Sequence, residues 1–277
     1  HINPGIFEVQ WSIPKIEKLQ PVELEFDGGE TAGLVEYDER MEIPRGVTIM
    51  PITDRQIRSR PGVRGWGGQK SSCNGALGVP LLKQIDNAWG WISYANPDPN
   101  WRGPRSGPIS RSGCGIMSFI MAYVKACNRI SDVCPDGKVN EDTVRNWIYQ
   151  AIPLAHARGS GKNNGTTIAA FDHMAKNVRF IKNRDEILGR NNIEKLNKYL
   201  QQPNTAVIWP MGKGCFKYTG HYMLIVGVRN DRNYGKMYLI NDPARMGVLE
   251  VSRELLLRCT KSGFIVFSCK KGIRFGF

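Results

Sequence analysis

The sequence predicts an α+β fold in which a helical part packs against an antiparallel β-sheet, preceded by an extended N-terminal segment. Two features of the main part predict this class. Apolar residues recur at helical spacing through much of residues 89–200, and short apolar runs typical of strands dominate residues 205–268. The first 88 residues are instead rich in Pro and Gly, with short extended pieces such as "VELEF" and "GVTIMPI". We therefore expect an N-terminal extension over residues 1–88 and a main domain over residues 89–277.

Four helices are expected in the first part of the main domain. The apolar spacing after Cys114 predicts a buried helix over residues 115–129. The segment "NEDTVRNWIYQAI" starts with Asn140, a residue type that caps helices, and predicts the second. Thr166 or Thr167 is placed to cap a third helix that ends near Asn177. The segment "IEKLNKYLQQ" predicts the fourth.

Strands are expected in the last part of the chain, at "TAVIW", "HYMLIVGV", "KMYLIN" and "GFIVFS". We expect the last three to be antiparallel neighbours, because short connections join them apart from a helical "RELLLR" insertion. Antiparallel pairing brings the start of "HYMLIVGV" beside the end of "KMYLIN". This topology predicts that His221 and Asp242 are neighbours in space.

The charge balance and the lack of certain motifs narrow the function classes. A formal net charge of +13 fits either an evenly basic surface or attraction to an anionic partner, such as a cell-wall polymer. No zinc-finger spacing or helix-turn-helix pattern favours a specific nucleic-acid partner, and no phosphate-binding loop is present. No apolar run approaches the ~20 residues that span a bilayer. Because the first residue is His1, we expect a processed product or part of a larger multi-domain protein.

Seven cysteines leave at least one thiol outside any disulfides. None of them forms a C-x-x-C pair, so we expect no zinc site and no other metal or cofactor. Cys127 and Cys134 are close enough in sequence to pair, but their spacing alone does not establish it.

Cys114, in "SRSGCGIMSFIMAY", has three possible roles: buried structural thiol, half of a disulfide, or nucleophile. A nucleophilic cysteine must form a thiolate, and a helix N-terminus stabilises that anion. Cys114 directly precedes the predicted buried helix, and Gly113 and Gly115 leave room for a substrate backbone. This pattern favours the nucleophile.

A thiol nucleophile needs a base, a group that orients the base, and donors for an oxyanion. Of the four histidines, His221 begins a predicted strand at the rim of the sheet and is the expected base; structural or surface roles are expected for the others, His1, His156 and His173. Asp242, at the end of the next strand, is expected to orient His221. The backbone N–H of Cys114 and the side-chain amide of Asn96, in "YANPDPNW", are the expected oxyanion donors.

Together these segments resemble the papain-like cysteine peptidases, especially the bacterial branch that includes the double-glycine peptidases that process bacteriocin leaders. The likeness lies in "SGCGIMSFIMAY", "GHYMLIVGV" and "YLINDPA", and more weakly in "YANPDPNW", which is similar to a family segment Gln-x-Asp-Pro-x-Trp. It covers roughly residues 90–270 and includes the order of Cys114, His221 and Asp242 along the chain.

The resemblance implies a papain-like fold in which Cys114 is the nucleophile, His221 the general base and acid, and Asp242 the group that orients His221. The family's oxyanion glutamine falls on Asn96, whose side chain is one methylene shorter. A rival nucleophile is Cys73, four residues after a glutamine in "GGQKSSCNG", although Pro80 interrupts any helix that would follow it.

Three functions remain open on this reading. The first is a peptidase that cleaves a peptide or protein substrate through a thioester acyl-enzyme. The second is a catalytically weak or inactive papain-like module that binds partners within a larger secreted or cell-surface bacterial protein. The third is transfer of the acyl group to an amine. We expect an extracellular or cell-surface location in each case.

Overall fold

The structure is a computed structural model that describes residues 63–66, 70–162, 165–177, 186–188, 192–212, 215, 220–244, 246–261 and 263–269, with only the backbone for 63–66 and 186–188. These residues belong to one compact unit that begins at Thr53. Leu81 and Leu82, which precede the expected boundary at residue 88, lie in the hydrophobic core shared with the helices. The predicted strands "VELEF" and "GVTIMPI" lie outside the described residues.

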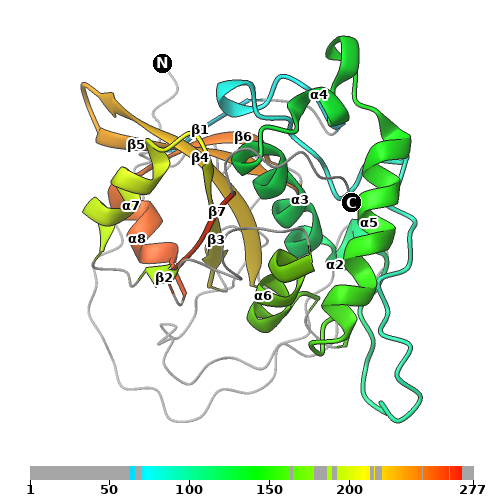
Figure 1. Cartoon of the computed structure of the whole chain (residues 1–277). Helices are drawn as coiled ribbons and strands as arrows, with labels where there is room; N and C mark the ends of the chain where they lie inside the picture. The colour runs from blue at the N-terminus through cyan, green and yellow to red at the C-terminus, as the bar shows by residue number, and fades with distance from the viewer. Residues whose placement is uncertain are drawn as a thin grey trace, which may run out of the picture. The chain divides into compact units, whose positions relative to one another are not determined.

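The α+β class is confirmed, with helices packed against an antiparallel sheet (Figure 1). In the described part of the chain the sheet has seven strands in the order β1-β6-β5-β4-β3-β7-β2, and every neighbouring pair is antiparallel. The strands are β1 Val63–Trp66, β2 Glu186–Leu188, β3 Thr205–Met211, β4 His221–Asp231, β5 Gly235–Asp242, β6 Gly247–Ser252 and β7 Phe264–Ser268.

The expected strand neighbours are right for β4 and β5 but wrong for β7. Strand β7 pairs with β3 on one side and β2 on the other, away from β5. The reason is the helical "RELLLR" segment, which forms α8 (Arg253–Cys259) and packs on β5 and β6. This connection carries the chain from β6 past β5, β4 and β3 before β7 begins.

Three strands of the described sheet were not predicted: β1, β2 and β6. Strand β6 is the neighbour of β5, and β1 pairs with β6 at one edge of the sheet. Strand β1 has only four residues and lies in "SRPGVRGWGGQKSSCNG", where Pro and Gly predict a loop. Its pairing with β6 is a tertiary contact, which local composition does not reveal.

The four predicted helices are present. The helix after the cysteine is α3 Cys114–Ala126, and the others are α5 Glu141–His156, α6 Ile168–Asn177 and α7 Ile193–Leu200. The predicted caps are confirmed for two of them. The Asn140 side chain accepts a hydrogen bond from the Thr143 N–H at 3.1 Å, and the Thr167 hydroxyl accepts one from the Ala170 N–H at 3.3 Å. Short helical turns complete the described part: η1 Ala76–Gly78, α2 Ile109–Ser112, α4 Ile130–Val133 and η2 Pro135–Gly137.

Helix α3 is the central element of the core. In Figure 1 helices α3, α5 and α6 lie on one side of the sheet, and α7 and α8 lie on the other. The Phe119 ring meets Phe267 of β7 edge-on at 5.9 Å, and Tyr123 meets Trp147 of α5 at 5.4 Å. Packing on both sides fixes the axis of α3 and therefore the position of its first residue, Cys114. No helix in the described part of the chain is long and apolar enough to cross a bilayer.

Candidate active site

Cys114 is the first residue of α3 and is partly exposed. The other six cysteines form three disulfides, Cys73–Cys134, Cys127–Cys269 and Cys215–Cys259. Cys114 is thus the one cysteine that keeps a thiol. The rival nucleophile Cys73 is excluded because it is disulfide-bonded, and the Cys127–Cys134 pair left open by spacing is not formed. A thiolate at Cys114 lies where the partial positive charge of the α3 N-terminus stabilises it.

His221 and Asp242 form a buried pair at one end of the sheet. The His221 Nε2 atom lies 2.6 Å from Asp242 Oδ1, and each side chain is 1% exposed. The sheet topology accounts for this contact. The antiparallel register of β4 and β5 pairs Leu224 with Asn241, so the start of β4 lies beside the end of β5.

The Asp242 carboxylate is fixed by more than the imidazole. Its Oδ1 atom accepts a second hydrogen bond from the Ala244 N–H at 2.8 Å, and its Oδ2 atom accepts one from the Met246 N–H at 2.9 Å. These donors come from the turn that follows β5. They hold the carboxylate in the orientation that engages His221 Nε2. The other ring nitrogen, Nδ1, is buried on the opposite edge of the ring. Nδ1 is therefore the nitrogen suited to exchange a proton with a substrate or a thiol.

Two tyrosines lie within electrostatic range of Cys114. Burial raises the pKa of Tyr94 and of Tyr222 well above the usual value, and the charge of Cys114 raises both further. The Tyr94 hydroxyl bonds Thr166 Oγ1 at 2.8 Å, and Thr166 packs directly on Gly115. Tyr222 follows His221 in β4. Because the charge of Cys114 acts on Tyr222, the thiol and the first residues of that strand lie in the same region of the molecule. Both phenols stay neutral near pH 7.

Asn96 is buried and directed toward a different loop. Its Nδ2 atom donates to the Ser160 carbonyl at 2.8 Å and to the His156 carbonyl at 3.3 Å, and its Oδ1 atom accepts from the Asp98 N–H at 3.0 Å. Both amide hydrogens are therefore used by backbone carbonyls. In this arrangement Asn96 shapes the loop around residues 156–160, and its amide has no hydrogen left for an oxyanion.

Gln84 is a buried amide that the sequence reasoning missed. Its side chain donates from Nε2 to the Ser110 carbonyl at 2.7 Å, and its backbone N–H donates to the Pro243 carbonyl at 2.7 Å. Gln84 thus links the residue after Asp242 to a residue shortly before Cys114. A signal was present in the sequence. "QIDNAW" has the Gln-x-Asp-x-x-Trp spacing of the family segment, with Asn87 in the proline position.

His156 and His173 lie on helices α5 and α6, outside the contact between His221 and Asp242. The His156 ring stacks on Tyr94 with centroids 5.7 Å apart, and its Nε2 atom lies 3.1 Å from the Tyr94 carbonyl. Burial lowers the pKa of His156, which favours the neutral ring. His173 lies within α6. His1 lies outside the described residues.

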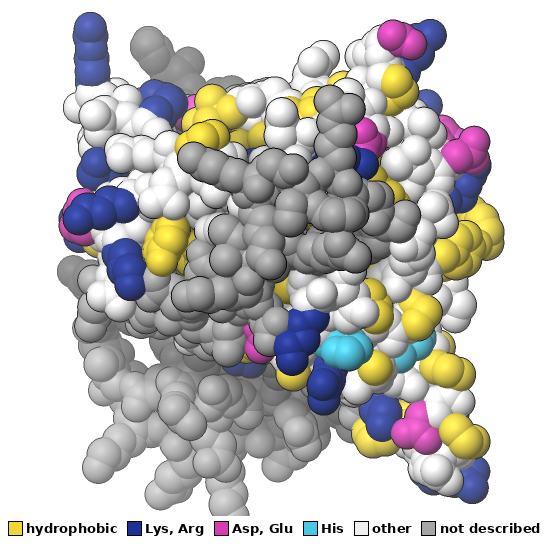
Figure 2. Space-filling view, viewed as in Figure 1, with side chains coloured by type: hydrophobic (Ala, Val, Ile, Leu, Met, Phe, Trp, Pro, Cys, Tyr) yellow, Lys and Arg dark blue, Asp and Glu magenta, His cyan; other side chains and the backbone are white. Residues whose placement is uncertain are grey.

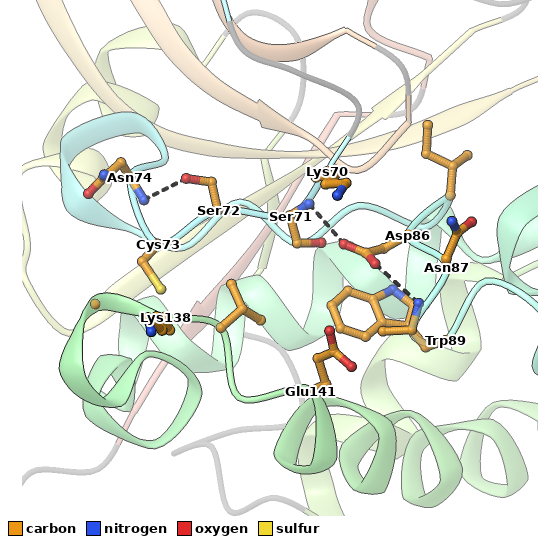
Figure 3. A pocket seen from close by; sticks show the side chains of 14 residues that line it. Lys70, Ser71, Ser72, Cys73, Asn74, Asp86, Asn87, Trp89, Lys138 and Glu141 are labelled. Atoms are coloured by element: carbon orange, nitrogen blue, oxygen red, sulfur yellow. Dashed lines mark hydrogen bonds between the residues drawn. The ribbon is translucent and has the colours of Figure 1, made fainter.

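A polar cavity of about 790 Å³ lies apart from the candidate active site. It is bounded by residues 70–74, 85–89 and 137–141, and neither Cys114, His221 nor Asp242 lines it (Figure 3). Asp86 closes one wall, where its carboxylate accepts from the Ser71 N–H at 2.9 Å and from the Ala88 N–H at 3.2 Å.

Among the described residues on the face drawn in Figure 2, Lys and Arg side chains are spread among polar and apolar ones. Among the described residues, no group of three or more His, Cys, Asp or Glu side chains is arranged to hold a metal ion.

Comparison with known proteins gives no family assignment. No protein-family model matches the chain, and no curated protein has a significantly similar sequence.

Proposed function

We propose that this chain is a papain-like cysteine peptidase in which Cys114 is the nucleophile, His221 the general base and acid, and Asp242 the group that orients His221. The observation that carries the proposal is the buried 2.6 Å contact between His221 Nε2 and Asp242, combined with a non-disulfide cysteine at the start of a central helix. A buried imidazole held by a carboxylate is the arrangement that activates a nucleophile in hydrolases of this kind.

The reaction follows from these roles. Cys114 transfers its proton to His221, and the thiolate attacks the carbonyl carbon of the scissile amide. The amide C–N bond then breaks as His221 gives the proton to the leaving amine, which leaves a thioester on Cys114. A water molecule, deprotonated by His221, attacks the thioester carbon and releases the acid and the thiol.

The oxyanion formed in each step needs two donors. The backbone N–H of Cys114 is one. Gln84 is a better candidate than Asn96 for the other, because one of its two Nε2 hydrogens remains after the bond to the Ser110 carbonyl, within the described residues. The short Asn96 side chain is one reason to expect an inactive binding module, beside the long N-terminal extension, and Gln84 as the donor weakens that one reason.

The two amides provide a direct test of this assignment. We expect Gln84→Ala to lower kcat by about 10²–10³, the usual effect of losing one oxyanion donor, whereas Asn96→Ala lowers stability with a smaller effect on kcat. Hydrolysis of a peptide library is the assay. Loss of activity in Asn96→Ala with full activity in Gln84→Ala would reverse the assignment.

Thiol alkylation across pH tests the nucleophile independently of any substrate. An activated Cys114 reacts with iodoacetamide at pH 5–6, well below the ordinary thiol pKa of about 8.5. Cys114→Ala is the control for labelling elsewhere. A wild-type rate that simply follows ionisation of an ordinary thiol would overturn the proposal. Adding amines to the peptidase assay and analysing the products tests whether the acyl group passes to an amine instead of water.

The proposed setting is extracellular or at the cell surface, with a peptide or protein substrate. Three disulfides fit a protein that matures in an oxidising compartment. The net charge of +13 is compatible with an anionic cell-wall or surface polymer as a partner.

A further inference from the structure

A fully buried lysine lies against the backbone of Asp242. Lys83 is 0% exposed, and its Nζ atom lies 3.4 Å from the Asp242 carbonyl oxygen. The backbone of Lys83 is fixed on both sides, since its N–H donates to Ser71 Oγ at 2.9 Å and its carbonyl accepts from Trp89 Nε1 at 2.7 Å. The side chain is therefore held in place beneath the end of β5.

An ammonium in such a position requires negative charge nearby. Removing a charged group from water is very unfavourable unless an opposite charge and hydrogen bonds replace the solvent. Asp242 carries a carboxylate that is itself 1% exposed. A buried carboxylate and a buried ammonium on adjoining segments compensate each other, whereas either one alone leaves an unbalanced charge in the core.

Other charged groups on the neighbouring elements are exposed or engaged elsewhere, within the described residues. The Asp86 carboxylate accepts from two backbone N–H groups, and Glu250 of β6 forms an ion pair with Arg229 at 2.5 Å. The charged side chains next to Ser71 and Ser110 in the sequence and at the start of α8 are exposed: Lys70, Arg111, Arg253 and Glu254. His221 and Asp242 are buried at this end of the sheet, and the neutral phenols of Tyr94 and Tyr222 lie within electrostatic range of Cys114.

We propose that Lys83 is a positioning residue whose buried positive charge balances Asp242 and sets the pH range in which Cys114 and His221 form an ion pair. This inference rests on the proposed function. With Lys83 charged, the four groups Lys83, Asp242, imidazolium and thiolate sum to zero. Without it, the interior keeps a net negative charge in both the neutral and the ion-pair forms of the thiol and imidazole.

The direction of the effect follows from the charge. A positive charge lowers the pKa of every acid near it, the thiol and the imidazolium alike. The ion pair of Cys114 and His221 exists at pH values between the pKa of the thiol and the pKa of the imidazolium. Removal of the Lys83 charge raises both pKa values, so the pH range of the ion pair moves upward at both ends. A neutral side chain of similar length, Lys83→Met, is expected to shift both limbs of the pH profile upward by about one unit.

The experiment is the pH profile of Cys114 alkylation by iodoacetamide in wild type, Lys83→Met and a matched control, Lys125→Met. Lys125 is a partly buried lysine, which donates to the Thr205 carbonyl near the far end of α3. It lies eleven residues along α3 from Cys114, or about 16 Å at 1.5 Å per residue. We expect its profile to match wild type. A shift of both limbs in Lys83→Met alone supports the proposal.

Two other results would overturn it. An activated wild-type profile with no shift in Lys83→Met refutes the role of Lys83 and leaves the proposed function standing. An ordinary thiol profile in the wild type refutes the proposed function and this inference together.

A second measurement uses the wild-type protein and does not depend on the folding of Lys83→Met. Nitrogen NMR of the full chain with labelled lysine distinguishes an ammonium from a neutral amine at Lys83. An ammonium at pH 7 supports the proposal, and a neutral amine overturns it.

Discussion

Asp242→Asn is the most informative single substitution for the geometry of the candidate site. The carboxylate accepts three hydrogen bonds, from His221 Nε2, the Ala244 N–H and the Met246 N–H. An asparagine keeps one oxygen acceptor and turns its NH₂ group toward a donor. One charge-assisted hydrogen bond is then lost, and the other two become hydrogen bonds to a neutral acceptor. Together these changes lower the unfolding free energy by about 3–5 kcal/mol.

For a domain of this size, that loss lowers Tm by roughly 10 °C. Differential scanning calorimetry measures it directly and needs no substrate. The matched control is Asp231→Asn. Asp231 accepts from two backbone N–H groups in the turn after β4 and pairs with Arg229, away from His221. We expect the control to lose much less stability. Equal melting temperatures for Asp242→Asn and wild type would refute the reasoning about the buried pair.

Three further predictions concern other parts of the domain. Alkylation of the unreduced folded chain is expected to add one label, on Cys114, and none to Cys114→Ala; two or more labels in mass spectrometry would contradict the disulfide pairing. Gly115→Ala places a methyl group 2.3 Å from Thr166 Oγ1, which is expected to lower the unfolding free energy by about 1–3 kcal/mol in urea titrations, with partial recovery in the double variant with Thr166→Gly. Burial lowers the pKa of Lys125 from 10.5 to about 8, so between these values the unfolded chain binds more protons. The unfolding free energy of wild type relative to Lys125→Met should therefore rise with pH across that interval, and a flat difference would contradict the burial of the ammonium.

The helix that begins at Cys114 is predictable because its residues are almost all apolar and recur at helical spacing. The same holds for the cap at Asn140 and for the contact between His221 and Asp242, which depends only on two adjacent antiparallel strands. These features follow from periodicity, capping chemistry and hairpin topology.

Other features depend on tertiary contacts that local pattern does not encode. The position of β7 beside β3 follows from the course of α8 across the sheet. Nothing in "PLLKQ" distinguishes a buried Lys83 from an exposed one, since lysine is almost always exposed. Gln84 is different, because its spacing to Trp89 fits the family segment as well as that of Asn96 does. The two amides differ in their hydrogen bonds to backbone carbonyls, which the sequence does not show.

The disulfide between Cys127 and Cys269 has a consequence for how the chain acquires its fold. These two cysteines are 142 residues apart, whereas Cys134 lies seven positions after Cys127. In an unfolded chain the shorter loop is favoured entropically by about 2–3 kcal/mol. Oxidation before the sheet forms therefore favours the wrong pair, and Cys114 is a further competitor for every partner. Refolding of the scrambled chain should thus need a thiol reagent for disulfide exchange, and its yield reports how early β7 joins β3 during folding.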